Sequence, residues 1–435
     1  MEKKRYKSLF VYFVAYYTLL LFTSKIIPLF TLINLIFILH FSAIFFKMTS
    51  RQVLPTMILL LIISTPLSFT SILGLPYGQL PISWFNLSIL LIILYVLARG
   101  LVKRNIVFNS VSTISLLILL YLLVPMLNSS NVIEGVKQVL NYYLFFLVII
   151  IWPNIKLGIT EIKASKRVYI ASVVAVACVV ILQAGLFRLG FSTGNTLLLG
   201  GNRFATGYLF SDYSFLSLYL LTPVFFIYFE KMRVVLKIPL LLLLAIASFM
   251  TTARTGITAL GICIILFLFV YTLKNIIKRT PLIVVFWSGL ITIGSVILFL
   301  VGKVRSGDLL SGSGRMEGYT IAISEWLKSP LLGIGFDMRT YKENVGTAMP
   351  HNIVIQTLLQ GGIVYLFLFV ILFLIIYLSI YKVNKHEIWG FILVILGAQF
   401  IPDILDSRFF LVIILLLLIK NKENVSQNNR KSLSL

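Results

Sequence analysis

Long apolar runs dominate this chain of 435 residues and restrict what it can fold into. Hydrophobic residues make up 59% of the sequence, charged residues 12%, and the mean hydropathy is +1.02, which leaves too little polar surface for a water-soluble fold of this length. Backbone inside a bilayer must satisfy its own hydrogen bonds, and runs of about 17 to 25 apolar residues are too long for barrel strands. The sequence therefore predicts an all-α polytopic membrane protein.

Fourteen apolar ranges are candidate membrane spans: 8–23, 26–46, 53–73, 81–98, 106–127, 138–152, 168–187, 207–229, 234–250, 255–273, 281–301, 363–381, 387–402 and 408–420. The sixth, thirteenth and last ranges are short for a hydrocarbon layer of about 30 Å, so twelve or thirteen spans also fit. We predict a single transmembrane helical domain over residues 1–420, a bundle of about 12 to 14 helices. A polar tail, rich in Asn and Ser, follows over residues 421–435 and is predicted to be disordered and cytoplasmic.

The basic residues of the connections predict the orientation of the bundle. With a cytoplasmic N-terminus, 25 of the 37 Lys and Arg residues fall on the cytoplasmic side and 12 on the outer side, so both termini are cytoplasmic. The net charge of +23 follows from this bias and requires no nucleic-acid partner. The outer side holds seven Arg and five Lys. Because a guanidinium grips phosphate in a bidentate manner, this preference indicates either an anion or phosphate site or simple interfacial anchoring of the arginines.

The longest polar interruption runs from Gly302 to Met349 and leads directly into Pro350-His351-Asn352. We predict that residues 302–362 form an extracytoplasmic loop with short helices that bears the active site. Apolar residues at helical spacing predict an amphipathic helix that begins near Arg315, after an N-cap at Ser313: Tyr319, Ala322, Ile323, Trp326 and Leu327. Pro350 at a first helical position predicts another helix, closed by Gly361-Gly362.

Three outward side chains are candidates for chemistry. Arg254 sits in a short connection near the membrane boundary, where burying a guanidinium costs at least about 2.5 kcal/mol unless it faces a polar cavity or an anion. Arg315, in the first turn of its helix, opposes the helix dipole unless an anion compensates. His351, in the first turn of the next helix, is kept neutral by the same dipole, as a general base must be. Structural readings stay open: an interfacial anchor for Arg254, neutralisation of Arg315 by Glu317 or Asp308, and a helix-start role for His351.

The other polar features predict little chemistry. Cys178 and Cys263 lie inside apolar spans without metal-like spacing, so we expect neither a disulfide nor a zinc site. Asp403, Asp406 and His40 are interpreted as structural. The first apolar run lacks a small-residue cleavage site and predicts a retained helix.

The residues around His351 resemble the signature region of the O-antigen ligase and Wzy polymerase superfamily. The resemblance rests on Arg315, on E-W-L-K-S-P-L-L-G-I-G-F at 325–336, on His351-Asn352, on G-G-I at 361–363 and on T-A-R-T-G at 252–256. It extends more loosely to residues 203–207 and covers roughly residues 200–381. At 211–214 the chain has S-D-Y-S where the family pattern predicts a Pro-Asn pair.

The resemblance implies a GT-C-like enzyme that transfers an oligosaccharide from an undecaprenyl-diphosphate carrier to an acceptor sugar hydroxyl, at the outer face of a bacterial cytoplasmic membrane. It implies that His351 is the base and that Arg315 and Arg254 hold the donor diphosphate. Further substrate-binding candidates are Arg203, Arg305, Arg339, Asn352 and Glu317. Inversion at the anomeric carbon is expected, without a metal or other cofactor. The expected partners are the lipid-linked donor and acceptor, membrane lipids and other polysaccharide assembly proteins.

Within the superfamily, we predict a polymerase of capsular, O-antigen or other surface polysaccharide, because residue usage rich in Lys, Ile, Asn and Phe fits an AT-rich genome and a Gram-positive capsule producer. A ligase that transfers glycan to lipid A core is the first alternative. A non-enzymatic flippase would be expected to carry pseudo-repeats and mid-membrane charges, which the sequence lacks. A SEDS-type peptidoglycan glycosyltransferase would rely on a carboxylate such as Glu317 or Asp337 instead of His351.

Overall fold

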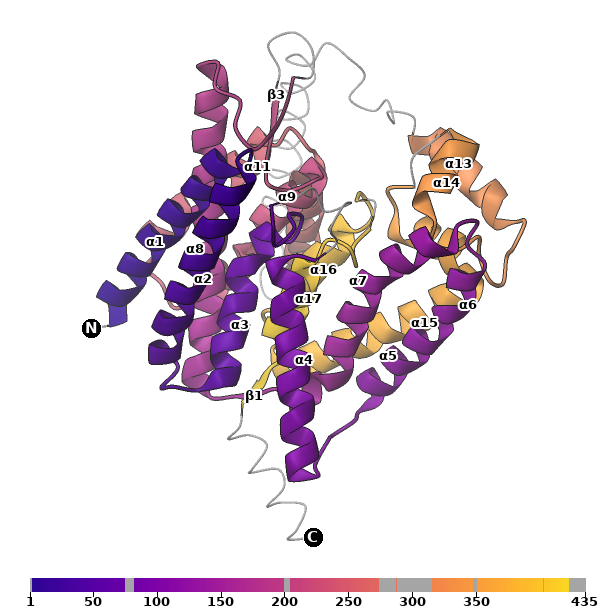
Figure 1. The fold of residues 1–435 in the computed structure, drawn as a ribbon, viewed down its shortest axis with the longest axis horizontal. Coiled ribbons are helices and arrows are strands. Elements are labelled where there is room, and N and C mark those ends of the chain that lie inside the picture. The colour runs from indigo at the N-terminus through magenta and orange to yellow at the C-terminus, as the bar shows by residue number, and fades with distance from the viewer. Residues whose placement is uncertain are drawn as a thin grey trace.

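The computed structural model describes residues 2–74, 82–198, 204–273, 287, 315–346, 350–401 and 403–421. In this part the chain is a helical bundle with two short strand pairs (Figure 1). Its helices are α1 (Glu2–Thr23), α2 (Ile27–Met48), α3 (Val53–Ser64), η1 (Thr65–Leu67), α4 (Trp84–Lys103), α5 (Ser110–Tyr121), α6 (Leu123–Leu127), α7 (Val132–Ile151), η2 (Trp152–Asn154), α8 (Ile159–Arg188), α9 (Tyr213–Leu221), α10 (Val224–Phe229), α11 (Val234–Met250), an unlabelled helix at Thr255–Leu273, α13 (Arg315–Trp326), α14 (Met338–Val345), α15 (Ile353–Val383), α16 (Ile388–Gly397) and α17 (Phe409–Leu418).

Seven segments of the described chain are long and apolar enough to cross a membrane: α2, α4, Ser110–Leu127, Val132–Asn154, α8, Thr255–Leu273 and α15. Six shorter apolar segments accompany them: Ser8–Thr23, Val53–Leu67, Tyr213–Phe229, α11, α16 and α17. Every predicted span overlaps one of these segments except 281–301, which lies outside the described residues apart from Trp287. The all-α membrane class is thereby confirmed, while the number of spans stays a prediction.

Two apolar helices form the inner part of the bundle. Helix α8 packs against α1, α3 and α11, and its small buried residues Ser172, Ala175 and Ala177 allow close approach of neighbouring helices. Helix α17 is apolar on every side, and all ten of its residues are buried. A helix that is hydrophobic all round belongs in an interior, so composition alone explains the central place of α17.

Buried hydroxyl groups connect the N-terminal helices. The Tyr17 hydroxyl donates to the Ile63 carbonyl at 2.9 Å and lies 2.7 Å from Ser172 Oγ. The Tyr208 hydroxyl in turn donates to the Tyr17 carbonyl at 3.1 Å. A buried polar group is tolerated only when it is hydrogen-bonded, so these contacts fix how α1, α3 and α8 sit against one another.

Two short strand pairs complete the fold. Strands β2 (Asn195–Leu198) and β3 (Phe204–Tyr208) are antiparallel, and Thr196 faces Thr206 in their register. Residues 204–207, to which the family resemblance extends loosely, therefore lie in a strand. The next helix begins at Tyr213 and not at residue 207, because the Asp212 carboxylate accepts from the amides of Ser214 and Phe215 and caps α9. The residues that depart from the family pattern thus form a helix cap.

The connections divide between two ends of the bundle, which we name the β1 end and the α13 end. At the β1 end, strand β1 (Lys156–Leu157) pairs in parallel with β4 (Lys420–Asn421). Ion pairs join Lys166 to Glu387 and Arg167 to Glu230 there. At the α13 end, Asn128 Nδ2 donates to the Gly333 carbonyl at 2.8 Å. Figure 1 places β1 at the bottom and α13 with α14 at the upper right. Residues 156–167, Glu230, Glu387 and residues 420–421, which lie in or next to connections predicted to be cytoplasmic, thus share one end.

Helices α13 and α14 form a small cap on the start of α15. Ala322, Tyr341 and Leu359 form a buried apolar cluster that joins the three helices, with Trp326 beside it. The predicted helix from Arg315 is confirmed, but its buried face differs from the prediction. Ile323 and Leu327 are 41% and 62% exposed, whereas Ala322 is buried. Among the described residues, Ala322 and Trp326 are the α13 members of the apolar cluster with α14 and α15.

Candidate functional site

His351 lies at the corner where the chain enters α15. The Asn352 side-chain oxygen accepts from the amides of Val354 and Ile355 at 3.0 and 3.1 Å, so Asn352 is the N-cap and the helix begins at Ile353. The predicted place of His351 in the first helical turn is wrong. An asparagine supplies the acceptor that the first orphan amides need, and this moves the helix start two residues beyond His351. His351 therefore precedes the helix.

Helix α13 is hydrogen-bonded to this corner. The Tyr319 hydroxyl donates to the His351 carbonyl at 3.0 Å. Tyr319 lies one turn after Arg315, which is the first residue of α13. The backbone start of α13 and the His351 corner are thus neighbours, while the side chain of Arg315 lies outside the described part of the structure.

The connection between α16 and α17, residues 398–408, gathers the other candidate segments. The Asn352 side-chain amide donates to Gln399 Oε1 at 3.2 Å, and the Ile353 amide donates to the Ala398 carbonyl at 3.1 Å. From the other side, Thr255 Oγ1 donates to the Phe400 carbonyl at 3.4 Å. Because Arg254 directly precedes Thr255, the structure brings the Arg254 and His351 segments to the same three residues of this connection.

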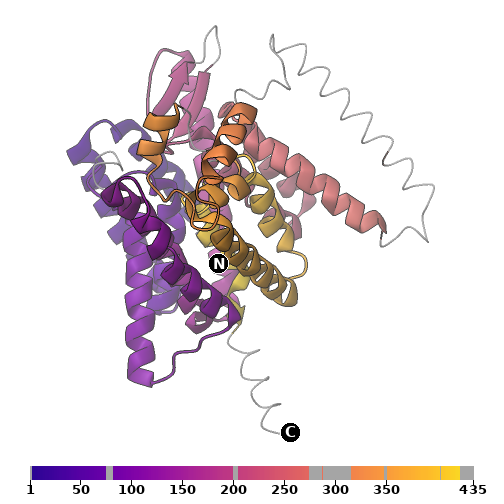
Figure 2. The ribbon, with the colours of Figure 1, turned by 90° about the vertical axis from the view of Figure 1, so that its right-hand side faces the viewer.

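The start of the helix Thr255–Leu273 is held close to α9. The Gly256 amide donates to Ser217 Oγ at 3.1 Å, and a Cβ added at Gly256 would lie 2.4 Å from the Ser217 carbonyl oxygen. Only glycine allows this approach. Arg254, two residues before Gly256, has an exposed side chain. Figure 2 shows this helix in salmon along one flank of the molecule.

The remaining predicted substrate-binding residues are dispersed or not described. Arg203 and Arg305 lie outside the described residues. The Arg339 guanidinium pairs with Glu343 at 2.9 Å on the exposed surface of α14. Glu317 is exposed in the first turn of α13. The structure therefore brings the chain segments of Arg254 and of His351-Asn352 together. The Arg339 side chain lies in a surface ion pair.

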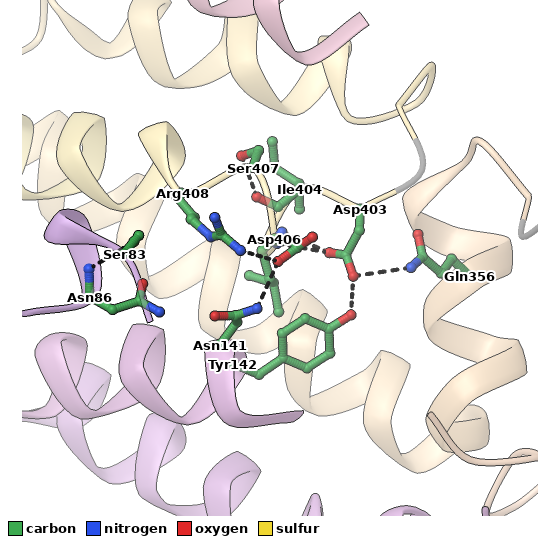
Figure 3. A network of polar contacts seen from close by, with 11 residues as sticks. Ser83, Asn86, Asn141, Tyr142, Gln356, Asp403, Ile404, Asp406, Ser407 and Arg408 are labelled. Carbon is green, nitrogen blue, oxygen red and sulfur yellow. Dashed lines mark hydrogen bonds and ion pairs between the residues drawn. The ribbon is translucent and has the colours of Figure 1, made fainter. Parts of the chain in front are cut away.

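A buried acidic network next to this region was interpreted from the sequence as structural (Figure 3). The carboxylate of Asp403 accepts from the Tyr142 hydroxyl, from Gln356 Nε2 at 3.2 Å, and from the amides of Leu405 and Asp406. Gln356 lies one turn after Asn352, so Asp403 contacts the same helix start as the His351 corner. Burial, followed by the charge of Asp406, raises the pKa of Asp403 to about 7.

Asp406 extends the network towards α7 and α4. Its Oδ1 accepts from Asn141 Nδ2 at 3.0 Å and lies 3.4 Å from an Arg408 guanidinium nitrogen. The guanidinium also stacks 4.7 Å from the centre of the Phe69 ring. A small cavity that Asn86, Asn141 and Arg408 help to line has room for about one water molecule. Sequence reasoning missed this grouping, although its signal was present: three charged residues within six positions between two apolar helices.

Chemically, the α13 end combines a histidine corner, an exposed arginine and a carboxyl that titrates near neutral pH. Such a set can accept a proton from a hydroxyl and can bind an anion at the membrane surface. Asp403 is buried, so it can influence the site through Gln356 but does not itself reach a large ligand.

Comparison with known protein families finds a match to part of the chain. A family model described as O-antigen ligase matches residues 239–370. The matched segment contains Arg254, Arg315 and His351, but it begins after Arg203 and ends before Asp403. The resemblance inferred from the sequence is confirmed over this segment. No curated protein matches the chain.

Proposed function

We propose that this chain, an integral membrane protein of the O-antigen ligase and Wzy-type superfamily by its segment 239–370, is an inverting glycosyltransferase. Its reaction polymerises lipid-linked oligosaccharide repeat units into capsular, O-antigen or other surface polysaccharide. The donor is an oligosaccharide on undecaprenyl diphosphate, and the acceptor is a sugar hydroxyl of a second lipid-linked chain.

In the proposed reaction, the acceptor hydroxyl oxygen attacks the anomeric carbon of the donor sugar from the face opposite the diphosphate. The new bond forms between carbon and the acceptor oxygen, and the bond to the diphosphate oxygen breaks. His351 takes the hydroxyl proton, and the electron pair of the broken bond leaves with the lipid diphosphate. Arg254 and Arg315 stabilise the charge that grows on this leaving group, which is the role that positioned cations perform best where water is scarce.

One observation carries the proposal. The segments of Arg254 and His351 are far apart in the chain, yet both are hydrogen-bonded to residues 398–400, and Tyr319 ties the start of α13 to the His351 carbonyl. A base and two diphosphate-binding arginines must meet within one site, and this backbone arrangement favours such a meeting. A ligase is the second candidate, because the matched family is described as O-antigen ligase.

The proposal is tested by expressing variants in the parent bacterium after deletion of the gene and analysing its glycans. We expect His351→Ala to lower polymer formation by about 10²- to 10⁴-fold, the usual contribution of a general base. Single lipid-linked repeat units should then accumulate. His40→Ala is the matched control, because His40 is exposed and its ring packs against Tyr12 on the neighbouring helix.

Three other results would separate the alternatives. Normal polymer from His351→Ala at normal protein abundance would contradict the general-base role. Accumulation of long lipid-linked polymer, with loss of its transfer to lipid A core, would identify a ligase. Dependence on Glu317 or Asp337 in place of His351 would favour the carboxylate chemistry of a peptidoglycan glycosyltransferase.

A further inference from the structure

Helix α15 is broken nine residues after its start. Gly362 has φ 69° and ψ −171°, a backbone conformation that only glycine adopts readily. Residues 353–361 are therefore a half-helix with its own direction, separate from the long part of α15 that follows. His351 and Asn352 sit at the start of this half-helix, so its orientation sets the orientation of the His351 corner.

The turn at residues 330–335 supplies hydrogen bonds to the break. The amides of Ile334 and Gly335 donate to the carbonyls of Leu359 and Gln360 at 2.8 and 3.1 Å, and the Ile363 amide donates to the Pro330 carbonyl at 2.9 Å. Carbonyl groups at the end of a helix have no partner within it, and an unsatisfied backbone group in a membrane costs several kcal/mol. The turn thus makes the break possible.

This turn fits the half-helix closely. A Cβ added at Gly333 would lie 2.6 Å from the Gln360 carbonyl carbon, and one added at Gly362 would lie 2.1 Å from the Leu331 carbonyl oxygen. Contacts shorter than about 3 Å between backbone groups cannot be relieved by moving a side chain. The turn and the half-helix therefore form one closely packed unit.

Three side chains from the first half of the bundle hold this unit. The Tyr121 hydroxyl lies 2.8 Å from the Gly361 carbonyl oxygen and 3.1 Å from that of Leu331, so its hydrogen serves both sides of the break. Asn128 Nδ2 donates to the Gly333 carbonyl at 2.8 Å, and the Phe336 amide donates to Ser129 Oγ at 2.8 Å. All three lie in the segment from the end of α5 to the start of α7, outside the matched family segment.

We infer that Tyr121, Asn128 and Ser129 are positioning residues that fix the half-helix and thereby aim His351 for the proposed transfer reaction. The inference rests on the proposed function for its catalytic consequence only. We call these three residues the clamp. A displacement of about 1 Å at a reacting group lowers a rate by about 10²-fold, so loosening the clamp slows the chemical step without removing any group that binds substrate. The expected signature is a fall in kcat at constant KM.

The test compares Tyr121→Phe with Tyr143→Phe. Both substitutions remove one hydroxyl, but the buried hydroxyl of Tyr143 has no hydrogen-bond partner among the described residues. Amide hydrogen exchange of the full-length protein in lipid nanodiscs reports the half-helix directly. We expect exchange in residues 353–361 to become about tenfold faster in Tyr121→Phe and to stay unchanged in Tyr143→Phe. Asn128→Ala is the second clamp variant and should act in the same direction.

Membranes containing each variant are then supplied with the lipid-linked oligosaccharide extracted from the parent bacterium. We expect Tyr121→Phe to lower kcat by at least about tenfold with KM changed less than about twofold. Unchanged exchange in both clamp variants would overturn the clamp, and faster exchange with an unchanged kcat would overturn its positioning role. If the parent protein consumes no lipid-linked oligosaccharide, the proposed function fails, whereas the exchange experiment still decides whether the clamp exists.

Discussion

At Asp403, burial and hydrogen bonding have opposite effects on the pKa of one carboxyl group. Burial and the charge of Asp406 raise its pKa, while bonds from Tyr142 and two backbone amides lower it, and the balance leaves the pKa at about 7. Because Gln356 donates to the same carboxylate, the protonation state of Asp403 acts on the first turn of α15. One residue outside the matched family segment thus contacts the first turn of α15, which directly follows the His351 corner.

We expect this carboxyl to make stability depend on pH. An Asp in the unfolded chain has a pKa of about 3.9, and the folded value is about 7, so the folded state holds the proton more tightly. The resulting stabilisation is complete below pH 4 and is lost as the pH rises through 7. The Tm of the detergent-solubilised protein should fall between pH 5 and pH 8. In Asp403→Asn this component should vanish, and equal slopes for the two proteins would contradict the prediction.

Asn352 has two separable roles at the residue scale. Its oxygen caps α15, and its amide nitrogen bonds Gln399. We expect Asn352→Ala to lower the free energy of unfolding by about 1 kcal/mol, the usual value of an N-cap. Asn352→Asp should keep the cap but lose the bond to Gln399, so its Tm should lie nearer the parent protein while glycan formation falls.

The control for Asn352 is Asn109→Ala. Asn109 caps α5 by accepting from the Ser112 amide at 2.9 Å, and α5 carries none of the proposed catalytic residues. Loss of the Asn109 cap should destabilise the protein by a similar amount and leave glycan formation per folded molecule unchanged. An equal loss of product in both alanine variants would mean that stability alone accounts for the effect of Asn352.

At the scale of elements, a polar connection between two apolar helices holds several distant helices together. Residues 398–408 join two buried helices, and their backbone and side chains bond to α15, to the helix at Thr255–Leu273 and to α7. Buried backbone must find partners, so a connection at this depth bonds to whatever lies beside it. This requirement makes a short connection a meeting point for distant segments.

The close packing of the turn at residues 330–335 against the broken helix α15 can be tested by a substitution. Gly333 has φ 71°, and a Cβ there would approach the Gln360 backbone to 2.6 Å. We expect Gly333→Ala to lower the free energy of unfolding by at least about 2 kcal/mol, from the left-handed conformation and the clash together. The measurement is thermal unfolding of the solubilised protein, followed by tryptophan fluorescence.

Gly318→Ala is the matched control, because a Cβ added inside α13 at this position meets no described atom within 4 Å outside the backbone of its own helix. Replacing a glycine in a helix interior by alanine should stabilise that helix by about 0.5 to 1 kcal/mol. A smaller loss for Gly333→Ala than the gain for Gly318→Ala would show that the turn at residues 330–335 adapts to a side chain.

At the scale of the molecule, the bundle separates its polar connections into two ends. The β1 end joins residues 156–157 to 420–421 and carries the ion pairs of Lys166 and Arg167. The α13 end carries the His351 corner and the clamp. The excess of basic residues in the sequence predicts that the β1 end faces the cytoplasm. A lipid-linked substrate at the outer surface would then meet the α13 end.

Cysteine labelling of intact cells tests this orientation. Lys328→Cys at the α13 end should react with a membrane-impermeant maleimide, because Lys328 is exposed. Lys382→Cys at the β1 end should react only after the membrane is permeabilised. Cys178 and Cys263 lie within apolar helices, and the parent protein gives their background. Labelling of Lys382→Cys in intact cells would reverse the assigned orientation.

The sequence by itself determined the membrane class, the approximate positions of the long apolar helices now described, and the family resemblance around His351. These properties depend on composition and on short-range spacing, which are present in the sequence itself. The exact start of a helix was harder to predict, because it depends on a single capping side chain. The helix start was misplaced at His351, because the capping side chain of Asn352 decided it.

The tertiary structure alone decided which polar groups meet. Tyr121 reaches the carbonyl of Gly361, which is 240 residues away, and Tyr142 reaches Asp403, which is 261 residues away. Neither pair carries a sequence pattern, because each contact results from the packing of whole helices and from the need of buried backbone and carboxyl groups for partners. Apolar periodicity places a helix in the membrane, but only the assembled bundle selects its polar neighbours.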